Sequence, residues 1–207
     1  MDGVDNVTDW YAPAAVVLML QQFGVAFGAL SFVRERRLGI VDVYRVAPVN
    51  ATATLLGKYA AYLLIGSAIA ATLTGLVVGL LDVPIAASVG EVALVMALTL
   101  FASIGVGFVI SLASASDAQA VQYTMILLLA SLFFSGFFLS VDQLQDSTKW
   151  VTFLLPVSYG MTLLRDVMLR GAPIDEKILG GLVVYGLVMF ALAWLGTRRR
   201  MSIARTK

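Results

Sequence analysis

Long apolar runs alternate with short polar segments over the whole length of the chain. A membrane-spanning helix needs about 20 consecutive, mostly apolar residues, and five runs reach that length without a single Asp, Glu, Lys, Arg or His. These runs lie near residues 13–33, 59–81, 92–113, 121–141 and 178–196. The pattern predicts an all-α polytopic membrane protein in which residues 1–207 form one domain with five transmembrane helices.

The composition agrees with this prediction and limits the kinds of functional site that the chain can form. Hydrophobic residues make up 60% of the chain and charged residues only 13%, a balance typical of membrane proteins. The chain has no cysteine and no histidine, which argues against a metal site. The spans hold no ionisable pair at depth, which argues against a proton relay or an intramembrane protease. We therefore expect no catalytic residue and do not expect an enzyme.

Basic residues are concentrated in two segments, the loop at 34–58 and the C-terminal tail. Segments rich in Lys and Arg stay on the cytoplasmic side of a membrane, so both segments are expected there. Four spans separate them, which is the even number that this placement requires. The sequence thus predicts an N-terminus outside and a cytoplasmic C-terminus.

The stretch at 150–170 tests this topology because it is apolar but short. Its apolar part, Val151 to Leu164, has 14 residues and contains Pro156, which is too short to cross a bilayer. We expect a re-entrant or interfacial helical segment within an external region at 142–177. Pro156 and Gly160 are the residues expected to break the helix there.

Polar and small residues inside the spans have two interpretations. Gln21 and Gln22 need hydrogen-bond partners in lipid, so they either pack against neighbouring helices or face a substrate path. Pairs of small residues at four-residue spacing allow close approach of helices, for packing within the chain or between subunits. These pairs are Gly24/Gly28, Gly66/Ala70, Gly75/Gly79 and Gly107/Ser111.

The loop at 34–58 interrupts the apolar pattern with charges and a proline. Between Gly39 and Pro48 the apolar residues fall on one helical face, with Asp42 and Arg45 on the opposite face. A helix this short is unstable alone in water, so it must lie against the membrane surface, the bundle or another protein. The alternative is an ordinary cytoplasmic loop whose arginines reach the lipid headgroups.

The order of residues in this loop resembles a known family, the ABC-2 type permeases, over nearly the whole chain. Members carry Arg-Glu, then Gly, an acidic residue and Pro before a Gly-Lys that opens the next span. The matching positions here are Arg34-Glu35, Gly39, Asp42, Pro48 and Gly57-Lys58. The chain departs from the pattern at Ile40, where threonine is usual, and at Tyr44, where leucine is common.

A second block in the external region is similar to the same family. Members carry Ser-Gly, a short loop, then Pro, Tyr, Arg and Gly in order. The matching positions are Ser135-Gly136, Pro156, Tyr159, Arg165 and Gly171. The proline usual shortly after the Ser-Gly is missing, with Ser140 in that neighbourhood. The resemblance implies that this segment roofs a translocation path, with Arg165 and the adjacent Asp166 forming either a structural ion pair or an external gate.

The resemblance implies a membrane subunit that moves an amphipathic substrate (a lipid, drug or glycan) outward across the plasma or inner membrane. It implies a short cytoplasmic coupling helix that docks on a separate ATPase, which would bind the ATP and Mg, so this chain would bind no cofactor itself. A second permease copy and membrane lipids are the other expected partners, and no nucleic acid is expected. Arg34, Arg36 and Arg37 favour anchoring to anionic lipid. The residues expected to contact the ATPase are Glu35, Gly39, Asp42, Tyr44, Arg45 and Pro48.

Two other functions remain open from the sequence. The same loop would serve a membrane interaction or assembly protein that docks a cytoplasmic partner without transport, and a membrane enzyme is a third, less favoured reading. Family members usually have six spans, so the first is missing here. The acidic start of the chain resembles the end of an external region, as in a natural five-span form or a piece of a longer subunit.

Overall fold

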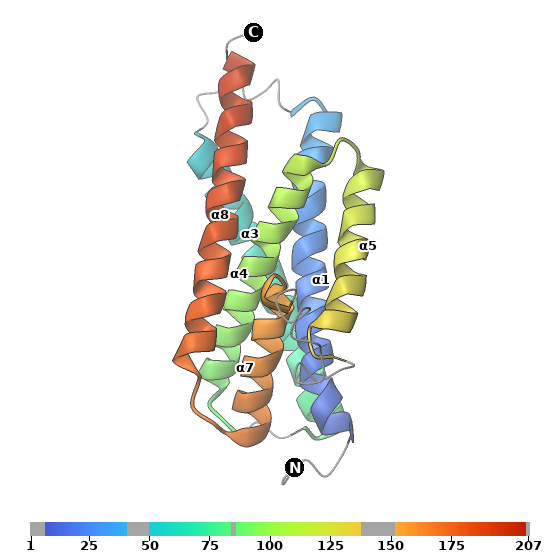
Figure 1. Ribbon diagram of the computed structural model, residues 1–207, viewed down its shortest axis with the longest axis vertical. Coiled ribbons are helices and arrows are strands. Elements are labelled where there is room, and N and C mark those ends of the chain that lie inside the picture. The colour runs from blue at the N-terminus through green and yellow to red at the C-terminus, as the bar shows by residue number, and fades with distance from the viewer. Residues whose placement is uncertain (1–6, 41–49, 84–85, 138–151, 206–207) are drawn as a thin grey trace.

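The computed structural model describes residues 7–40, 50–83, 86–137 and 152–205, and the regular structure in these ranges is entirely helical. Within these ranges, five helices are long and apolar enough to cross a membrane. They run roughly side by side along the long axis of the molecule, with the shorter α7 beside them (Figure 1). The helices are α1 (Val7–Arg37), α3 (Ala51–Leu81), α4 (Val89–Ala113), α5 (Asp117–Phe134), α7 (Pro156–Arg170) and α8 (Glu176–Arg205). The predicted all-α class with five candidate spans is therefore confirmed.

The helix bounds differ from the predicted spans mainly where polar residues begin or end a helix. α3 starts at Ala51 rather than near residue 59, since Asn50 caps it by accepting a hydrogen bond from Thr52 N at 3.2 Å. Thus the loop predicted at 34–58 is shorter, and the connection between α1 and α3 comprises residues 38–50. The fourth span, predicted to reach residue 141, ends as α5 at Phe134, because Ser135 caps it and Gly136 follows in the left-handed region at φ 87°.

α1 and α4 form the centre of the bundle and have the most extensive contact of any helix pair. Their backbones meet at glycines. A Cβ atom added to Gly28 would lie 2.7 Å from Ile104 O and 2.8 Å from Gly107 Cα. The small-residue pairs Gly24/Gly28 and Gly107/Ser111 therefore serve packing within the chain, the first of the two interpretations drawn from the sequence.

The remaining spans surround this pair, and they leave much apolar surface exposed. α8 packs on α4, α5 packs on α1, and α3 contacts α1, α4 and α8. In the most apolar 18-residue stretch of each helix, 11% of the residues are buried in α3 and 17% in α5 and α8, against 61% in α1 and α4. Such apolar exposure is expected of helices that face lipid tails.

The chain alternates direction so that the basic segments meet at one end. α1 ends, α3 begins and α8 ends at the upper end of the bundle in Figure 1, which we call the basic end. Arg34, Arg36 and Arg37 close α1 there, and Arg198 and Arg199 lie in the last turns of α8. This arrangement has the even number of crossings that the charge pattern requires.

α7 occupies the opposite half of the bundle, where the sequence predicts a re-entrant segment. Its first turn lies beside Gln21, near the middle of α1, and it runs from there toward the end where α1 begins (Figure 1). Its 15 residues correspond to about 22 Å of helix, so α7 does not cross. Pro156 is its first residue, as expected of a helix starter.

Gly160 does not break the helix, in contrast to the prediction. It lies inside α7, where an added Cβ would come within 2.9 Å of Val17 Cγ1 and closer still to the side chain of Thr99. The glycine is needed for close packing of α7 against α1 and α4, which outweighs its low helix propensity.

Candidate functional site at the basic end

The connection between α1 and α3, residues 38–50, is the candidate site. Residues 41–49 lie outside the described part of the chain, and so do four predicted contact residues, Asp42, Tyr44, Arg45 and Pro48. The two ends of the connection are described. Gly39 follows α1 at φ 70°, a left-handed conformation that glycine adopts without strain and that ends the helix. Asn50 caps α3 at the other end.

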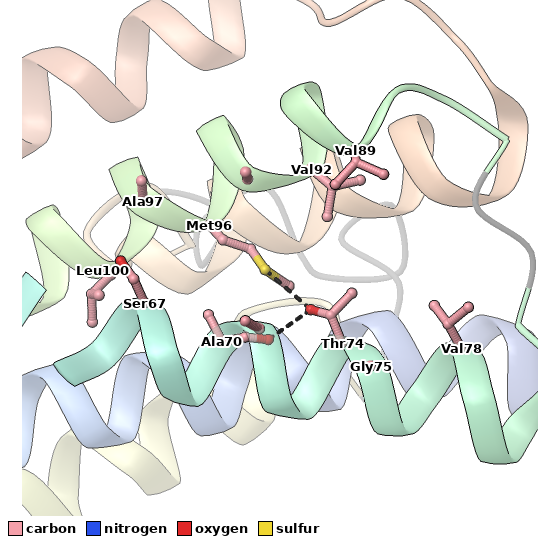
Figure 2. Close-up of a pocket in the computed structure, with 12 residues that line it drawn as sticks. Ser67, Ala70, Thr74, Gly75, Val78, Val89, Val92, Met96, Ala97 and Leu100 are labelled. Atoms are coloured by element: carbon pink, nitrogen blue, oxygen red, sulfur yellow. Dashed lines mark hydrogen bonds between the residues drawn. The ribbon is translucent and has the colours of Figure 1, made fainter. Parts of the chain in front are cut away.

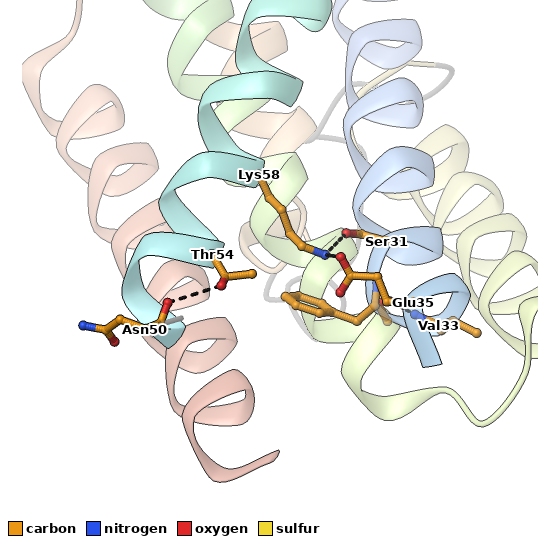
Figure 3. A network of polar contacts seen from close by, with 8 residues as sticks. Ser31, Val33, Glu35, Asn50, Thr54 and Lys58 are labelled. Atoms are coloured by element: carbon orange, nitrogen blue, oxygen red, sulfur yellow. Dashed lines mark hydrogen bonds and ion pairs between the residues drawn. The ribbon is translucent and has the colours of Figure 1, made fainter. Parts of the chain in front are cut away.

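An ion pair joins the two ends of this connection (Figure 3). Lys58 Nζ on α3 lies 2.7 Å from Glu35 Oε1 on α1, and donates a hydrogen bond to Ser31 Oγ at 2.7 Å. The ammonium also lies 3.9 Å from the centroid of the Phe32 ring. The side chains of Glu35 and Lys58 are only 19% and 13% exposed. The pair is therefore shielded from solvent and strengthened by neighbouring groups.

Two arginines at the end of α1 contact the ends of α4 and α5, although most of the Arg37 side chain stays exposed. Arg36 Nη2 donates to the carbonyl oxygens of Ser111 and Ser114, at 3.0 and 2.5 Å, and so satisfies carbonyls at the end of α4. Arg37 Nη1 lies 2.9 Å from Asp117 Oδ2 at the start of α5. Arg36 and Arg37 thus have partners inside the chain, whereas the sequence favoured lipid anchoring for both.

Hydroxyl groups make further hydrogen bonds between helices at this end of the bundle. Ser111 Oγ on α4 accepts hydrogen bonds from the backbone N–H groups of Phe32 and Val33 on α1, at 2.9 and 3.1 Å. Trp194 Nε1 on α8 donates to Thr52 Oγ1 on α3 at 2.9 Å. These contacts therefore tie together the ends of all five candidate spans at the basic end.

Gln21 and Gln22, the two residues proposed to line a substrate path, have different surroundings. Gln21 is fully buried. Its Nε2 donates to Ser131 Oγ on α5 at 2.7 Å, and its Oε1 accepts from Val157 N on α7 at 2.9 Å. Gln21 therefore joins three helices and lines no open path in this structure. Gln22 Oε1 is buried and has no hydrogen-bond partner among the described residues.

An apolar groove lies between α3 and α4, on the half of these helices toward the α7 end (Figure 2). Its volume is about 370 Å³. Thr74 is one of its two hydroxyl-bearing residues, and Thr74 Oγ1 already donates to Ala70 O at 2.8 Å and lies 3.3 Å from Met96 Sδ. The groove therefore presents an apolar surface. It is lined by Ser67, Ala70, Ala71, Thr74, Gly75, Val78, Val89, Val92, Ala93, Met96, Ala97 and Leu100.

Arg165 lies at the α7 end and holds three segments together. Its Nε donates to Trp10 O at 3.3 Å and its Nη1 to Gly136 O at 3.1 Å, and the guanidinium lies 4.3 Å from the centroid of the Trp10 ring. Burial lowers the pKa of the Arg165 guanidinium. The expected ion pair with Asp166 is not formed, because Asp166 pairs with Arg170, one helical turn away, at 2.7 Å. The structure does not test a gating role for Arg165.

Tyr159, the third residue predicted in the external segment, packs α7 against α8. Its ring would lie 2.9 Å from a Cβ added to Gly181, and its hydroxyl donates to Phe153 O at 3.2 Å. Pro156 and Tyr159 therefore shape and seat α7, and neither contacts the basic end.

We expect Arg165→Lys to lower the unfolding midpoint by about 5 °C, because one ammonium cannot reproduce the two directed hydrogen bonds and the ring contact of a planar guanidinium. Arg170→Lys is the matched control on the same helix, since the Arg170 side chain is 62% exposed and such pairs contribute little. Both variants should be compared by thermal unfolding in one detergent. Equal midpoints would show that Arg165 does not hold these segments together.

Sequence reasoning missed the pairing of Glu35 with Lys58 and the capping role of Arg36. A signal for the first was present, because opposite charges stand near the end of one span and the start of the next. Local sequence offers no comparable signal for Arg36, whose acceptors are backbone carbonyls of a distant helix. It also cannot show that Gln21 would bond to the first turn of α7.

Comparison with known proteins shows which family the chain resembles over most of its length. The family described as "ABC-2 family transporter protein" matches residues 2–195. Similar curated proteins include "Probable multidrug ABC transporter permease YbhS" of Escherichia coli (strain K12), 28% identical over 194 residues, which are 92% of this chain and 51% of that protein. "Probable multidrug ABC transporter permease YbhR" of the same strain is 21% identical over 167 residues, 80% of this chain and 45% of that protein.

A eukaryotic protein is also similar over most of the chain. "ABC transporter G family member 20" of Dictyostelium discoideum is 24% identical over 187 residues, which are 90% of this chain and 25% of that protein. The chain thus spans about half the length of the bacterial relatives it matches, or less.

Proposed function

The chain belongs to the ABC-2 family of transporter proteins, and from this premise we propose that it is the membrane subunit of an ATP-driven exporter. ATP and Mg would be bound by a separate ATPase, and the chain would act with a second permease copy. The observation that carries the proposal is the family match over residues 2–195, which includes the basic segment between α1 and α3 and all five candidate spans except the last turns of α8.

The geometry at the basic end supports a coupling role for the connection at 38–50. The Glu35–Lys58 pair joins the helices that flank the connection, and Arg36 joins α1 to α4. A force applied to the connection would therefore move several spans together, because α1 is linked to both α3 and α4. Leu38 and the side chain of Arg37 are 69% and 74% exposed there, so the end of α1 offers surface to a partner.

Orientation and substrate class follow as further parts of the proposal. The basic end would face the cytoplasm of a plasma or inner membrane, with the N-terminus outside. The substrate would be amphipathic, such as a lipid, a drug or a glycan carrying an apolar group. The similar bacterial proteins are described as probable multidrug ABC transporter permeases, and the apolar lining of the groove between α3 and α4 supports a substrate with an apolar part.

A charge reversal in the connection tests the coupling role. We expect Asp42→Arg to reduce stimulation of the cognate ATPase at least about tenfold in reconstituted vesicles, because like charges at an interface cost several kcal/mol. Lys177→Glu is the matched reversal, since Lys177 is exposed at the start of α8, away from the basic end. The measurements are ATP hydrolysis and substrate flux by the same vesicles.

Two outcomes would contradict the proposal. Full stimulation by Asp42→Arg would remove the coupling role of the connection. Stimulation of the ATPase without flux of any amphipathic probe would favour the alternative function, a membrane interaction protein that docks a cytoplasmic partner.

A further inference from the structure

Glu35 and Lys58 have an environment unlike that of the other charged pairs described in this chain. Arg37–Asp117 and Arg170–Asp166 each include a side chain more than 60% exposed. In the Glu35–Lys58 pair both side chains are less than 20% exposed. A shielded pair loses hydration, and it persists where further contacts hold its geometry.

Those further contacts come from the last turns of α1. Ser31 Oγ accepts a second hydrogen bond from the Lys58 ammonium, and the Phe32 ring lies beneath it as a cation–π partner. Phe32 is itself held, because its backbone N–H bonds to Ser111 Oγ and its ring lies 5.4 Å from that of Phe108. The position of Lys58 is thus determined from several sides, as Figure 3 shows for Ser31 and Glu35.

The two residues also flank the connection at 38–50. Glu35 lies in the last turn of α1, just before Gly39, and Lys58 lies in the second turn of α3. A contact between them links the two helix ends on either side of the connection. This link removes freedom that the two ends would otherwise have.

We propose that the Glu35–Lys58 pair is an intrachain clamp that sets the spacing and orientation of the two ends of the connection at 38–50. Glu35 is then a positioning residue, and it acts through Lys58 rather than by contacting the partner ATPase. Its consequence for transport rests on the proposed function, but the clamp itself does not. The clamp makes the ends of α1 and α3 move as one unit.

The exposed side chains at the basic end are consistent with Glu35 positioning the helix ends while other residues contact the ATPase. Leu38 and Arg37 present most of their side chains outward, so a docking protein can reach them without breaking an existing shielded contact. Reaching Glu35 would require displacing Lys58 from a site where it makes three contacts.

The clamp can be tested by distance measurement in the full chain, which has no cysteine of its own. Cysteines introduced at Leu38 and Ala53, both exposed, would carry spin labels at the two ends of the connection. We expect one narrow distance distribution by pulsed electron paramagnetic resonance. Glu35→Gln and Lys58→Met should each widen it and shift it to longer distances.

The charge-swapped double variant, Glu35→Lys with Lys58→Glu, decides between a clamp and a merely sensitive position. The clamp predicts that the swap gives a narrower distribution than either single variant, because the attraction is rebuilt with the charges exchanged while the cation–π contact with Phe32 is lost. A second label pair at Leu81 and Leu94, both exposed near the opposite end, should stay unchanged in every variant. Single variants that leave the 38/53 distances unchanged would overturn the proposal, and so would a swap as broad as the single variants. Widening of both label pairs in Glu35→Gln would overturn it too.

An assay of ATPase stimulation separates the clamp from the proposed function as a transporter subunit. With the cognate ATPase, the swap should recover most of the stimulation lost in Glu35→Lys alone. If Glu35 contacts the ATPase directly, the swap stays as inactive as the single variant and the positioning role is wrong. Because the distance measurement needs no ATPase, a chain that stimulated none would still report on the clamp.

Discussion

Replacing Gly28 with valine should lower the unfolding midpoint by about 10 °C, because it overpacks the closest helix crossing of the bundle at a cost of about 3 kcal/mol. A Cβ at this position would lie 2.7 Å from Ile104 O and within 2.9 Å of two backbone atoms of Gly107. Backbone atoms cannot swing aside as a flexible side chain can. α1 and α4 would have to separate, and the contacts along both helices would loosen.

The same substitution elsewhere in the chain provides the control. Gly75 lies inside α3, and an added Cβ there meets no described atom within 4 Å. Gly75→Val should therefore leave the midpoint unchanged or raise it slightly, since valine has a higher helix propensity than glycine. Thermal unfolding and gel filtration in the same detergent would compare the two variants. Equal midpoints would mean that the α1–α4 crossing is not as close as the structure shows.

Gln21→Leu should have the second large effect, about 2–4 kcal/mol of lost stability, because it leaves buried polar groups without partners. The N-cap of α7, Leu155, has no side-chain hydrogen bond to the first turn. Gln21 Oε1 supplies that acceptor from another helix through its bond to Val157 N, while Gln21 Nε2 binds Ser131 Oγ. Leucine would leave the Val157 N–H unpaired in the interior.

The measurement is hydrogen exchange at the start of α7, which should quicken in Gln21→Leu while α4 changes less. Gln22→Leu is the matched control at the neighbouring position. Because Gln22 Oε1 is buried without a partner among the described residues, losing it should cost little or stabilise the chain. If both leucine variants exchanged alike, Gln21 would not be the cap of α7.

The sequence identified the spans because membrane insertion depends on a local property, a run of apolar residues long enough to cross the bilayer. It also predicted a helical segment near Pro156 that is too short to cross, and α7 is such a segment, while its re-entrant position in the membrane stays a prediction. Helix ends were less well predicted. α3 begins ahead of its apolar run because Asn50 caps it, and α5 ends early because Gly136 takes a left-handed conformation. These are single-residue events that a long average of hydropathy does not detect.

Charge and family pattern predicted the candidate site in a loop at 34–58, and the structure shortens this loop to the connection at 38–50. Four of its predicted contact residues, Asp42, Tyr44, Arg45 and Pro48, lie outside the described residues and stay predictions. The ion pair of Glu35 with Lys58 was not predicted, because the two residues meet only when α3 packs against α1.

By itself, the sequence determined the class of the protein, the number of its candidate spans and the meeting of its basic segments at one end. Each of these follows from composition and from the order of apolar and charged residues. Only the tertiary structure decided which polar groups satisfy one another: Gln21 with α5 and α7, Arg36 with α4, and Glu35 with Lys58. The physical reason is that burying a polar group obliges it to find a partner, while the partner is chosen by the packing of helices distant in sequence.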